Sequence, residues 1–262
     1  MAESIGPVFI TGASSGIGEA LAAHYAAVGA TLGLVARRGD RLDTLAASLR
    51  ARDRATVLCY ALDVTDADAL RAAAEDFIRQ SGVPEIVIAS AGVSAGTVSE
   101  NREDLKSFKR IMDINVYGTA ATFSPFIAAM KQRGHGRLVG IASVAGIRGL
   151  PGAEAYSASK AATISYLESL RLEMRGTGVK VVTLAPGYIK TPMTDVNTYR
   201  MPFLMPVDQA ATRFAELIAR GCSYAVVPWP MGIVAKLMRL LPNWLYDFLF
   251  ARAPRKPRSA PL

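Results

Sequence analysis

Short apolar runs alternate along the chain with longer segments in which Ala and Leu recur at helical spacing. Several of the apolar runs lack the polar alternation of a strand with one wet face, as expected of parallel strands covered on both sides. The predicted strands are Pro7–Thr11, Thr31–Ala36, Thr56–Ala61, Ile86–Ala89, Gly136–Ile141, Lys180–Leu184 and Ala225–Val227. The predicted helices are Gly16–Val28, Arg41–Arg52, Asp66–Gln80, Arg102–Lys131, Ala155–Arg175 and Val207–Arg220. This order predicts an α/β fold with a doubly wound, parallel, seven-stranded sheet and helices on both faces.

Two segments depart from the simple alternation. The long helical segment Arg102–Lys131 is predicted to break near Tyr117-Gly118. The segment Tyr188–Pro206 is rich in proline and methionine and predicts a loop with a short helix, a length of connection that is often a substrate lid. With no repeat or flexible linker in the sequence, residues 1–230 are predicted to form one domain and residues 231–262 a tail.

Composition narrows the class of protein. The chain has 262 residues, of which 51% are hydrophobic and 20% are charged, which excludes a disordered chain. Two cysteines (Cys59, Cys222) and two widely separated histidines (His24, His135) predict neither a disulfide framework nor a metal site. The amino-terminal residues do not resemble a secretory signal, and no apolar run is long enough to span a membrane, so a cytoplasmic location is predicted.

The first predicted strand runs directly into a glycine-rich turn and then a helix. The turn is Thr11-Gly12-Ala13-Ser14-Ser15-Gly16-Ile17-Gly18. Glycines at this spacing let the backbone approach a pyrophosphate, which the free N–H groups and the dipole at the helix start also favour. The pattern predicts a dinucleotide site on a Rossmann-type fold that uses Gly12, Ser14, Ser15, Gly16, Ile17 and Gly18.

Two arginines stand where the second strand ends. A carboxylate at this position suits the ribose 2′-hydroxyl of NAD, whereas Arg37 and Arg38 suit a 2′-phosphate, so NADP(H) is favoured. The alternative is a pair of solvated arginines at a helix start, paired with Asp40 and Asp43. Asp63, with Val64 beside it, follows the third strand and is a candidate for adenine contact, although a helix N-cap is its competing role. Small residues after the fourth strand, Ala91 and Gly92 among them, let the cofactor lie against the backbone.

A tyrosine and a lysine four residues apart are the strongest catalytic candidates. Tyr156 and Lys160 share one face of a predicted helix. An ammonium beside a phenol is expected to lower the pKa of the phenol from about 10, which makes Tyr156 a usable general acid or base. Lys160 also has protons to donate to the nicotinamide ribose. Ser143 follows the fifth strand, where its hydroxyl can donate to a substrate oxygen that gains charge as hydride moves.

Taken together, these motifs resemble those of the short-chain dehydrogenase/reductase family, in its short, single-domain branch. The resemblance rests on the Thr11–Gly18 motif, Asp63, Asn115, Ser143, the Tyr156–Lys160 segment and Pro186-Gly187, and spans roughly Pro7 to Val227. One departure is Ala89-Ser90-Ala91-Gly92, where the family usually has Asn-Asn-Ala-Gly.

The resemblance adds roles that the residues alone do not give. It implies that Asn115 completes a catalytic set with Ser143, Tyr156 and Lys160 by holding a water that links Lys160 to solvent. It implies that the backbone of Ile189 and the hydroxyl of Thr191, in the segment that begins with Pro186 and Gly187, hold the nicotinamide carboxamide. Relatives commonly pair through the two long helices, which predicts a homodimer or homotetramer.

The expected function is therefore an NADP(H)-dependent oxidoreductase that interconverts a ketone or aldehyde and an alcohol. Apolar residues predicted at the rim, such as Met193, Phe203 and Leu204, favour a hydrophobic carbonyl substrate over a sugar. Two alternatives stay open: a sugar-nucleotide epimerase or dehydratase from the longer branch of the fold, and a non-catalytic NADP-binding sensor or scaffold. The glycine spacing and the short carboxyl-terminal part argue against the first, and the intact catalytic set argues against the second.

The tail carries much of the basic charge. The chain has a formal net charge of +8, and six basic residues against one acid between Lys236 and Arg258 leave only +3 elsewhere, which does not favour nucleic-acid binding. Apolar residues near helical spacing from Met231 to Phe250 predict two short helices divided at Pro242-Asn243. Arg252–Arg258 is predicted to be frayed. Three roles for the tail stay open: packing on the domain or a partner, a peripheral contact with the inner face of a membrane, and a non-specific polyanion contact.

Overall fold

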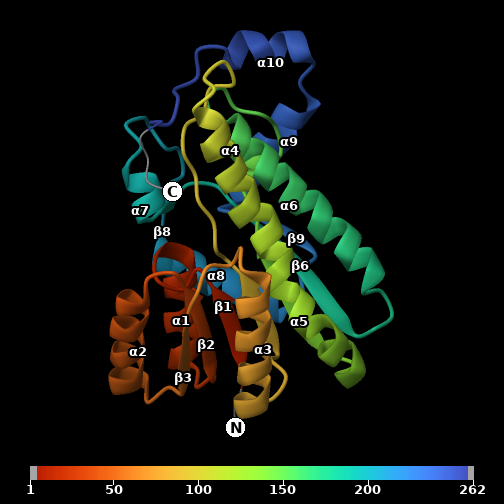
Figure 1. Ribbon diagram of the computed structural model, residues 1–262. Coiled ribbons are helices and arrows are strands. Elements are labelled where there is room, and N and C mark those ends of the chain that lie inside the picture. Colours follow the sequence, from red (N-terminus) through yellow and green to blue (C-terminus); the bar gives the residue numbers. More distant parts are fainter. Residues whose placement is uncertain (1–4, 259–262) are drawn as a thin grey trace.

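A computed structural model describes residues 5–258 and contains a central sheet of seven parallel strands (Figure 1). The strand order is β3-β2-β1-β4-β5-β6-β9, so the chain reverses direction across the sheet between β1 and β4. The strands are β1 (Val8–Thr11), β2 (Leu32–Ala36), β3 (Val57–Ala61), β4 (Ile86–Ala89), β5 (Gly136–Ile141), β6 (Val179–Pro186) and β9 (Tyr224–Val227). The predicted α/β class and all seven predicted strands are confirmed, with small shifts at their ends.

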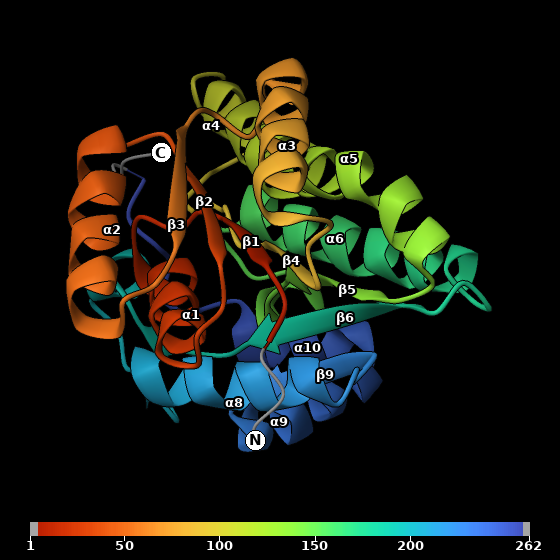
Figure 2. The ribbon, with the colours of Figure 1, turned by 90° about the horizontal axis from the view of Figure 1, so that it is seen from below.

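Helices cover both faces of the sheet. Figure 2, which views the molecule from below, shows the sheet between the two layers of helices. One apolar core lies beneath α1, α2 and α8 and includes Leu21, Leu42 and Phe214. The other lies beneath α3, α5 and α6 and includes Phe77 and Phe123. The helices of the two layers are α1 (Gly16–Ala27), α2 (Gly39–Asp53) and α8 (Val207–Ala219) on one face, and α3 (Ala67–Ser81), α4 (Asp104–Met112), α5 (Gly118–Arg133) and α6 (Glu154–Glu173) on the other.

The predicted division near Tyr117-Gly118 is present as an interruption of the α-helix, although the chain stays helical through it. A π-helical turn, Asp113–Tyr117, joins α4 to α5, and Gly118 has helical backbone angles. A Cβ atom on Gly118 would lie 2.7 Å from Cγ2 of Val64, so this glycine permits close packing and does not end the helix. A π turn inside a longer helix is often found at a functional site.

The segment between β6 and α8 folds into small elements over one end of the sheet. It contains β7 (Ile189–Lys190), the short helix α7 (Pro192–Asp195) and β8 (Met205–Pro206), and β7 pairs in parallel with β8. The short helix predicted for this segment is therefore present. Thr191 and Thr194 form a capping box that fixes the start of α7.

The tail forms the two predicted helices, α9 (Trp229–Leu240) and α10 (Asn243–Phe250), which pack on the domain. The guanidinium of Arg148 donates to the carbonyls of Met238 and Leu241, and the Tyr246 hydroxyl donates to Gly149 O at 2.6 Å. These bonds tie the end of α9 and Tyr246 on α10 to the loop after β5.

The segment after α10 is not frayed, contrary to the prediction. Gly96 N donates to Pro257 O at 3.0 Å, and Lys256 Nζ donates to Met193 O at 3.2 Å. Arg258 forms two parallel bonds with the Asp104 carboxylate, each 2.9 Å long. The prediction failed because these partners are remote in sequence and leave no local pattern.

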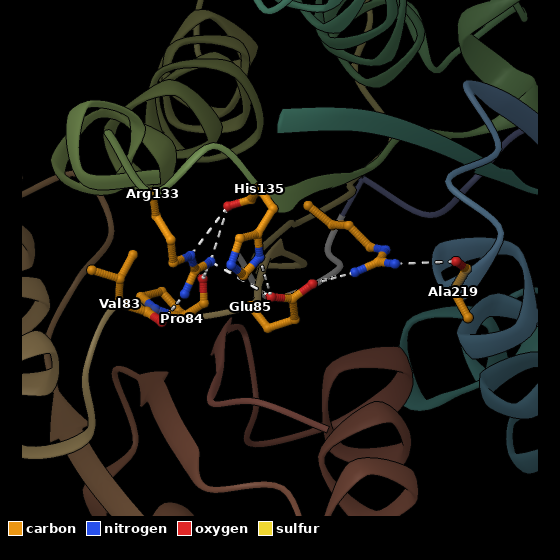
Figure 3. A network of polar contacts seen from close by, with 7 residues as sticks. Val83, Pro84, Glu85, Arg133, His135 and Ala219 are labelled. Carbon is orange, nitrogen blue, oxygen red and sulfur yellow. Dashed lines mark hydrogen bonds and ion pairs between the residues drawn. The ribbon is translucent and has the colours of Figure 1, made fainter. Parts of the chain in front are cut away.

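A network of polar side chains lies at the amino ends of strands β4 and β5 (Figure 3). Glu85, just before β4, accepts from Arg137 Nη1 at 2.5 Å and lies 2.9 Å from His135 Nδ1. Arg133 donates to the carbonyls of Val83 and Pro84. The network fixes the amino ends of β4 and β5, away from the carboxyl ends where ligands bind in such sheets.

Within residues 5–258, no helix is both long and apolar enough to cross a membrane. The same part of the chain contains no group of three or more His, Cys, Asp or Glu side chains that could hold a metal ion.

Candidate active site

A cleft of about 530 Å³ opens at the carboxyl ends of β1 and β4, where the strand order reverses. This is the position at which doubly wound sheets bind ligands, and the volume is typical of a cofactor site. The predicted residues that line the cleft are Gly12, Ser14, Ser15, Gly16, Ile17, Arg37, Arg38, Asp63, Val64, Ala91, Gly92, Ser143, Tyr156, Lys160, Pro186, Gly187, Ile189 and Thr191. Gly18 and Asn115 lie behind its walls.

At two of its glycines, Gly12 and Gly18, the glycine turn packs too tightly for any side chain. Gly12 has a φ of +71°, and a Cβ there would lie 2.6 Å from the backbone nitrogen of Ala91. Gly18 is buried behind the turn, and a Cβ there would overlap the carbonyl of Gly12, so only glycine fits. Helix α1 begins at Gly16, so its first free N–H groups point into the cleft.

Arg38 is held over this turn. Its Nη2 donates to the hydroxyls of Ser14 at 3.0 Å and Ser15 at 3.2 Å. Arg37 also lines the cleft, and both side chains are exposed. The structure therefore gathers two guanidinium groups and two hydroxyls, all suited to an anion, at one end of the cleft.

Asp63 is tied to two neighbours within the cleft wall. Its Oδ2 accepts from Arg110 at 2.6 Å, and its Oδ1 accepts from the backbone nitrogen and the hydroxyl of Thr65. Partial burial raises the pKa of this carboxyl, but the bonds from Arg110 and Thr65 outweigh burial and lower the pKa below its ordinary value. Asp63 is thus a fixed carboxylate, and the alternative role of helix N-cap falls to Asp66, which accepts from Ala69 N.

Helix α6 presents Tyr156 and Lys160 to the middle of the cleft beside Ser143. Nζ of Lys160 lies 5.8 Å from the centre of the Tyr156 ring and donates to Ile141 O at 2.8 Å. Ser143 follows β5, and its hydroxyl accepts from Ala145 N, which fixes the position of the oxygen. Ser143 and Lys160 are both buried.

Burial dominates the pKa values of this group. Burial raises the pKa of Tyr156, although its hydrogen bond with Ser143 acts in the opposite sense. Burial lowers the pKa of Lys160 to about 8. The expectation that the ammonium lowers the phenol pKa is therefore wrong in direction for the protein alone, because loss of hydration disfavours the charged form of each side chain.

Asn115 sits in the π-helical turn and braces the site from behind. Its Oδ1 accepts from Val93 N at 2.8 Å, and its Nδ2 donates to Val93 O and to the hydroxyl of Ser159. The side chain therefore ties the loop after β4 to helix α6, which carries Tyr156 and Lys160. The backbone carbonyl of Asn115 accepts from the hydroxyls of Thr119 and Thr163.

The loop after β6 forms the wall opposite the glycine turn. Ile189 is buried, and the methyl of Thr191 would lie 3.3 Å from a Cβ on Gly16, so this wall meets the glycine turn directly. The sequence analysis missed several apolar lining residues on neighbouring strand ends and loops. Leu62 and Ala142 come directly after predicted strands and Ile141 ends one, which is the signal that could have found them, whereas Val93 and Val196 lie in loops with no such signal.

The residues present fit a nicotinamide dinucleotide. The glycine turn and the small residues after β4 leave space against the backbone. The buried Lys160 ammonium carries three donors and shares one with Ile141, which leaves donors for the hydroxyls of a ribose. The exposed guanidinium groups lie at the end of the cleft where an adenosine phosphate would be held.

Comparisons with known proteins agree with this geometry. The family described as short chain dehydrogenase matches residues 7–200. An uncharacterized oxidoreductase of Myxococcus xanthus is 40% identical over 91% of this chain and 93% of its own length.

Two solved structures share the fold and carry different cofactors. A short-chain dehydrogenase/reductase of Burkholderia phymatum in complex with NAD is 26% identical, covers 98% of this chain and 99% of its own, and has a TM-score of 0.82. A short-chain dehydrogenase of Sphingobium yanoikuyae in complex with NADPH is 28% identical, covers 91% and 97%, and has a TM-score of 0.77. The chain belongs to the short-chain dehydrogenase/reductase family of oxidoreductases, with an NAD(P)-binding Rossmann fold.

Proposed function

We propose that this protein is an NADP(H)-dependent reductase that interconverts a hydrophobic ketone or aldehyde and its alcohol. The observation that carries the proposal is the meeting of Ser143, Tyr156 and Lys160 at the middle of a cleft whose far end holds the glycine turn and Arg38. A dinucleotide laid along the cleft would bring its nicotinamide to these three side chains.

The side chains divide the work of carbonyl reduction. The bound cofactor supplies hydride. The Ser143 hydroxyl, whose oxygen is fixed by Ala145 N, donates to the carbonyl oxygen as negative charge gathers there. Tyr156, whose phenol carries its proton at neutral pH, gives that proton to this oxygen, and the hydrogen bond with Ser143 opposes the rise in the phenol pKa that burial causes. Lys160 would hold the ribose with the donors that it does not share with Ile141. The hydrogen bond from Ser143 favours the phenolate that remains, and Asn115 keeps α6 in position.

The preference for NADP(H) rests on Arg38 and Arg37. Arg38 already bonds the hydroxyls of Ser14 and Ser15, so its guanidinium is held where it would meet a 2′-phosphate. Both guanidinium groups line the cleft, and an acidic side chain at this position would repel the phosphate. Because the similar Burkholderia protein is in complex with NAD, the preference of this protein for NADP(H) over NAD(H) is to be measured directly.

The substrate side of the cleft favours an apolar molecule. Met193, Val196, Ile141 and Val93 line it, and Phe203 and Leu204 are exposed in the same loop as Met193. Removing this apolar surface from water would favour a hydrophobic carbonyl compound over a sugar.

A substrate screen tests the proposal. NADPH and NADH oxidation are measured across aliphatic, cyclic and aromatic ketones and aldehydes, with sugars as the polar arm. We expect turnover with hydrophobic carbonyl compounds and NADPH. Cofactor binding without turnover on any compound would favour the alternative, a sensor or scaffold, and turnover of sugars alone would contradict the substrate class.

We also propose a cytoplasmic homo-oligomer that pairs through α5 and α6. A groove between these helices is lined by small residues on α5 and by Tyr166 and Leu170 on α6. Small side chains let helices from two copies approach closely, which is how such a groove becomes buried in a dimer.

A further inference from the structure

Helix α9 has two apolar faces, and the fold uses only one. Met231 and Ala235 are buried against the domain, which forms the inner face. Trp229, Ile233, Leu237 and Leu240 recur at helical spacing on the outer face, where Trp229 is 73% exposed and Leu240 is 80% exposed. An outer apolar stripe of this kind is not explained by packing within the described residues.

Helix α10 continues the same exposed surface. Trp244 and Phe248 lie one helical turn apart and are 71% and 80% exposed, and Leu249 beside them is also exposed. The opposite side of α10 is fixed, because the buried Tyr246 donates to Gly149 O and stacks on Phe250. The exposed apolar side chains of α9 and α10, two helices that follow one another in the chain, are together called the apolar plateau.

The composition of the plateau is that of a helix at a membrane interface. Both tryptophans of the chain, Trp229 and Trp244, are on it, together with one phenylalanine and several large aliphatic side chains. Aromatic and aliphatic side chains on one face, with cations nearby, are typical of helices that lie in the plane of a bilayer. Large apolar side chains exposed in such number on two successive helices are typical of a surface with a binding role.

The charge of the residues around the plateau indicates what kind of surface covers it. Between residues 229 and 258 the chain carries six basic residues and one acid, Asp247. Arg258 is paired with Asp104, whereas Lys236, Arg239 and Arg252 are exposed. A second copy docked here by twofold symmetry would bring two surfaces of the same positive charge together. An anionic lipid surface would complement that charge while taking up the apolar side chains.

We propose that the apolar plateau docks the protein on an anionic lipid bilayer. Figure 1 shows α10 at one end of the molecule, with the chain returning from it to α7. The segment after α10 contacts α7 through Lys256, whose Nζ donates to Met193 O. Met193 in turn lines the cleft. The plateau and the mouth of the cleft therefore share one side of the protein, which suits the delivery of a substrate dissolved in the membrane.

The full-length protein tests this by vesicle binding and tryptophan fluorescence. Vesicles of phosphatidylcholine alone are compared with vesicles that contain phosphatidylglycerol. We expect co-sedimentation and a blue shift of the fluorescence with anionic vesicles, because both tryptophans leave water. High salt, about 1 M, is expected to weaken binding by about an order of magnitude because it screens the basic residues.

A variant separates the plateau from the rest of the surface. Trp244→Glu with Phe248→Glu is expected to weaken partitioning about tenfold or more, because charged groups replace the inserted side chains. Leu105→Glu, at a side chain on α4 with 60% exposure, is the matched control and should bind like the wild type. Circular dichroism of each variant verifies that it is folded.

Three results would overturn the proposal: no blue shift with anionic vesicles, equal loss of binding in the Leu105→Glu control, or a plateau variant that changes from dimer to monomer while the wild type ignores vesicles. The last result would assign the surface to a second copy. Tyr156→Phe should bind vesicles like the wild type, so failure of the catalytic proposal would leave this test intact.

Discussion

Lys160 and Tyr156 share one face of α6, and burial shifts the pKa values of both toward their neutral forms. Burial lowers the pKa of Lys160 to about 8 and raises the pKa of Tyr156. The spacing of the two residues is visible in the sequence, but the depth of the cleft is not. For that reason their pairing could be predicted, whereas the direction of the phenol pKa could not.

The lowered pKa of Lys160 has a consequence for stability. Between pH 8 and 10 the unfolded chain, in which a lysine has its ordinary pKa, binds more protons than the folded protein. Stability therefore rises with pH in this window, by about 2 kcal/mol for this one residue. Chemical denaturation at pH 8 and pH 10 should show a larger gain for the wild type than for Lys160→Met. Equal gains in the two proteins would show that Lys160 keeps an ordinary pKa.

Cofactor choice is a second property of single residues. Arg38→Asp would replace the guanidinium over Ser14 and Ser15 with a carboxylate that repels a 2′-phosphate. We expect the ratio of kcat/KM for NADPH over NADH to fall by at least about 10²-fold, since an attractive charge contact becomes a repulsive one. Arg41→Asp, on the exposed side of α2, is the control and should leave the ratio unchanged. An unaltered ratio in Arg38→Asp would refute the preference for NADP(H).

The segment after α10 is attached to helix α4 by the ion pair between Arg258 and Asp104. Arg258 bonds Asp104 in two parallel contacts, and Asp104 is also fixed by Val98 N. Asp104→Asn should loosen this segment and speed tryptic cleavage after Arg252 and Arg255 several-fold, because local opening exposes the backbone. Asp247→Asn, at an exposed acid on α10, is the control. Cleavage at the wild-type rate in Asp104→Asn would mean that the ion pair does not hold the segment.

The elements that could be predicted are those with a local pattern. Several of the seven strands are continuous apolar runs, and α9 and α10 are divided by Pro242, which cannot continue a helix. The π-helical turn around Asn115 has no such pattern, because the widened turn depends on packing against neighbouring elements. The segment that ends at Arg258 depends on Asp104, 154 positions earlier, so its order comes from tertiary contact alone.

At the scale of the whole molecule, the groove between α5 and α6 carries the oligomer proposal. Ala128 on α5 and Ser169 on α6 are exposed in this groove. Ala128→Glu would place a charge between the paired helices, and we expect it to lower the mass found by analytical ultracentrifugation to that of a monomer. Val28→Glu, at an exposed residue after α1, is the control. A wild type that is already monomeric would contradict the proposal.

The groove, the cleft and the apolar plateau lie on different elements of the protein. The groove is lined by residues of α5 and α6, the cleft lies at the carboxyl ends of the strands, and the plateau lies on α9 and α10. Figure 1 shows α10 at one end of the molecule. The three surfaces involve largely separate residues, so a dimer could form while the cleft stays open beside a membrane.

The central claim is that the Tyr156 phenol delivers the proton in carbonyl reduction. The most direct measurement is the kcat of Tyr156→Phe, which removes one oxygen from the cleft, together with the affinity for NADPH. We predict a fall in kcat of about 10²–10⁴-fold with unchanged NADPH affinity, since the phenol acts only on the reacting oxygen. Turnover at the wild-type rate in Tyr156→Phe would contradict the account.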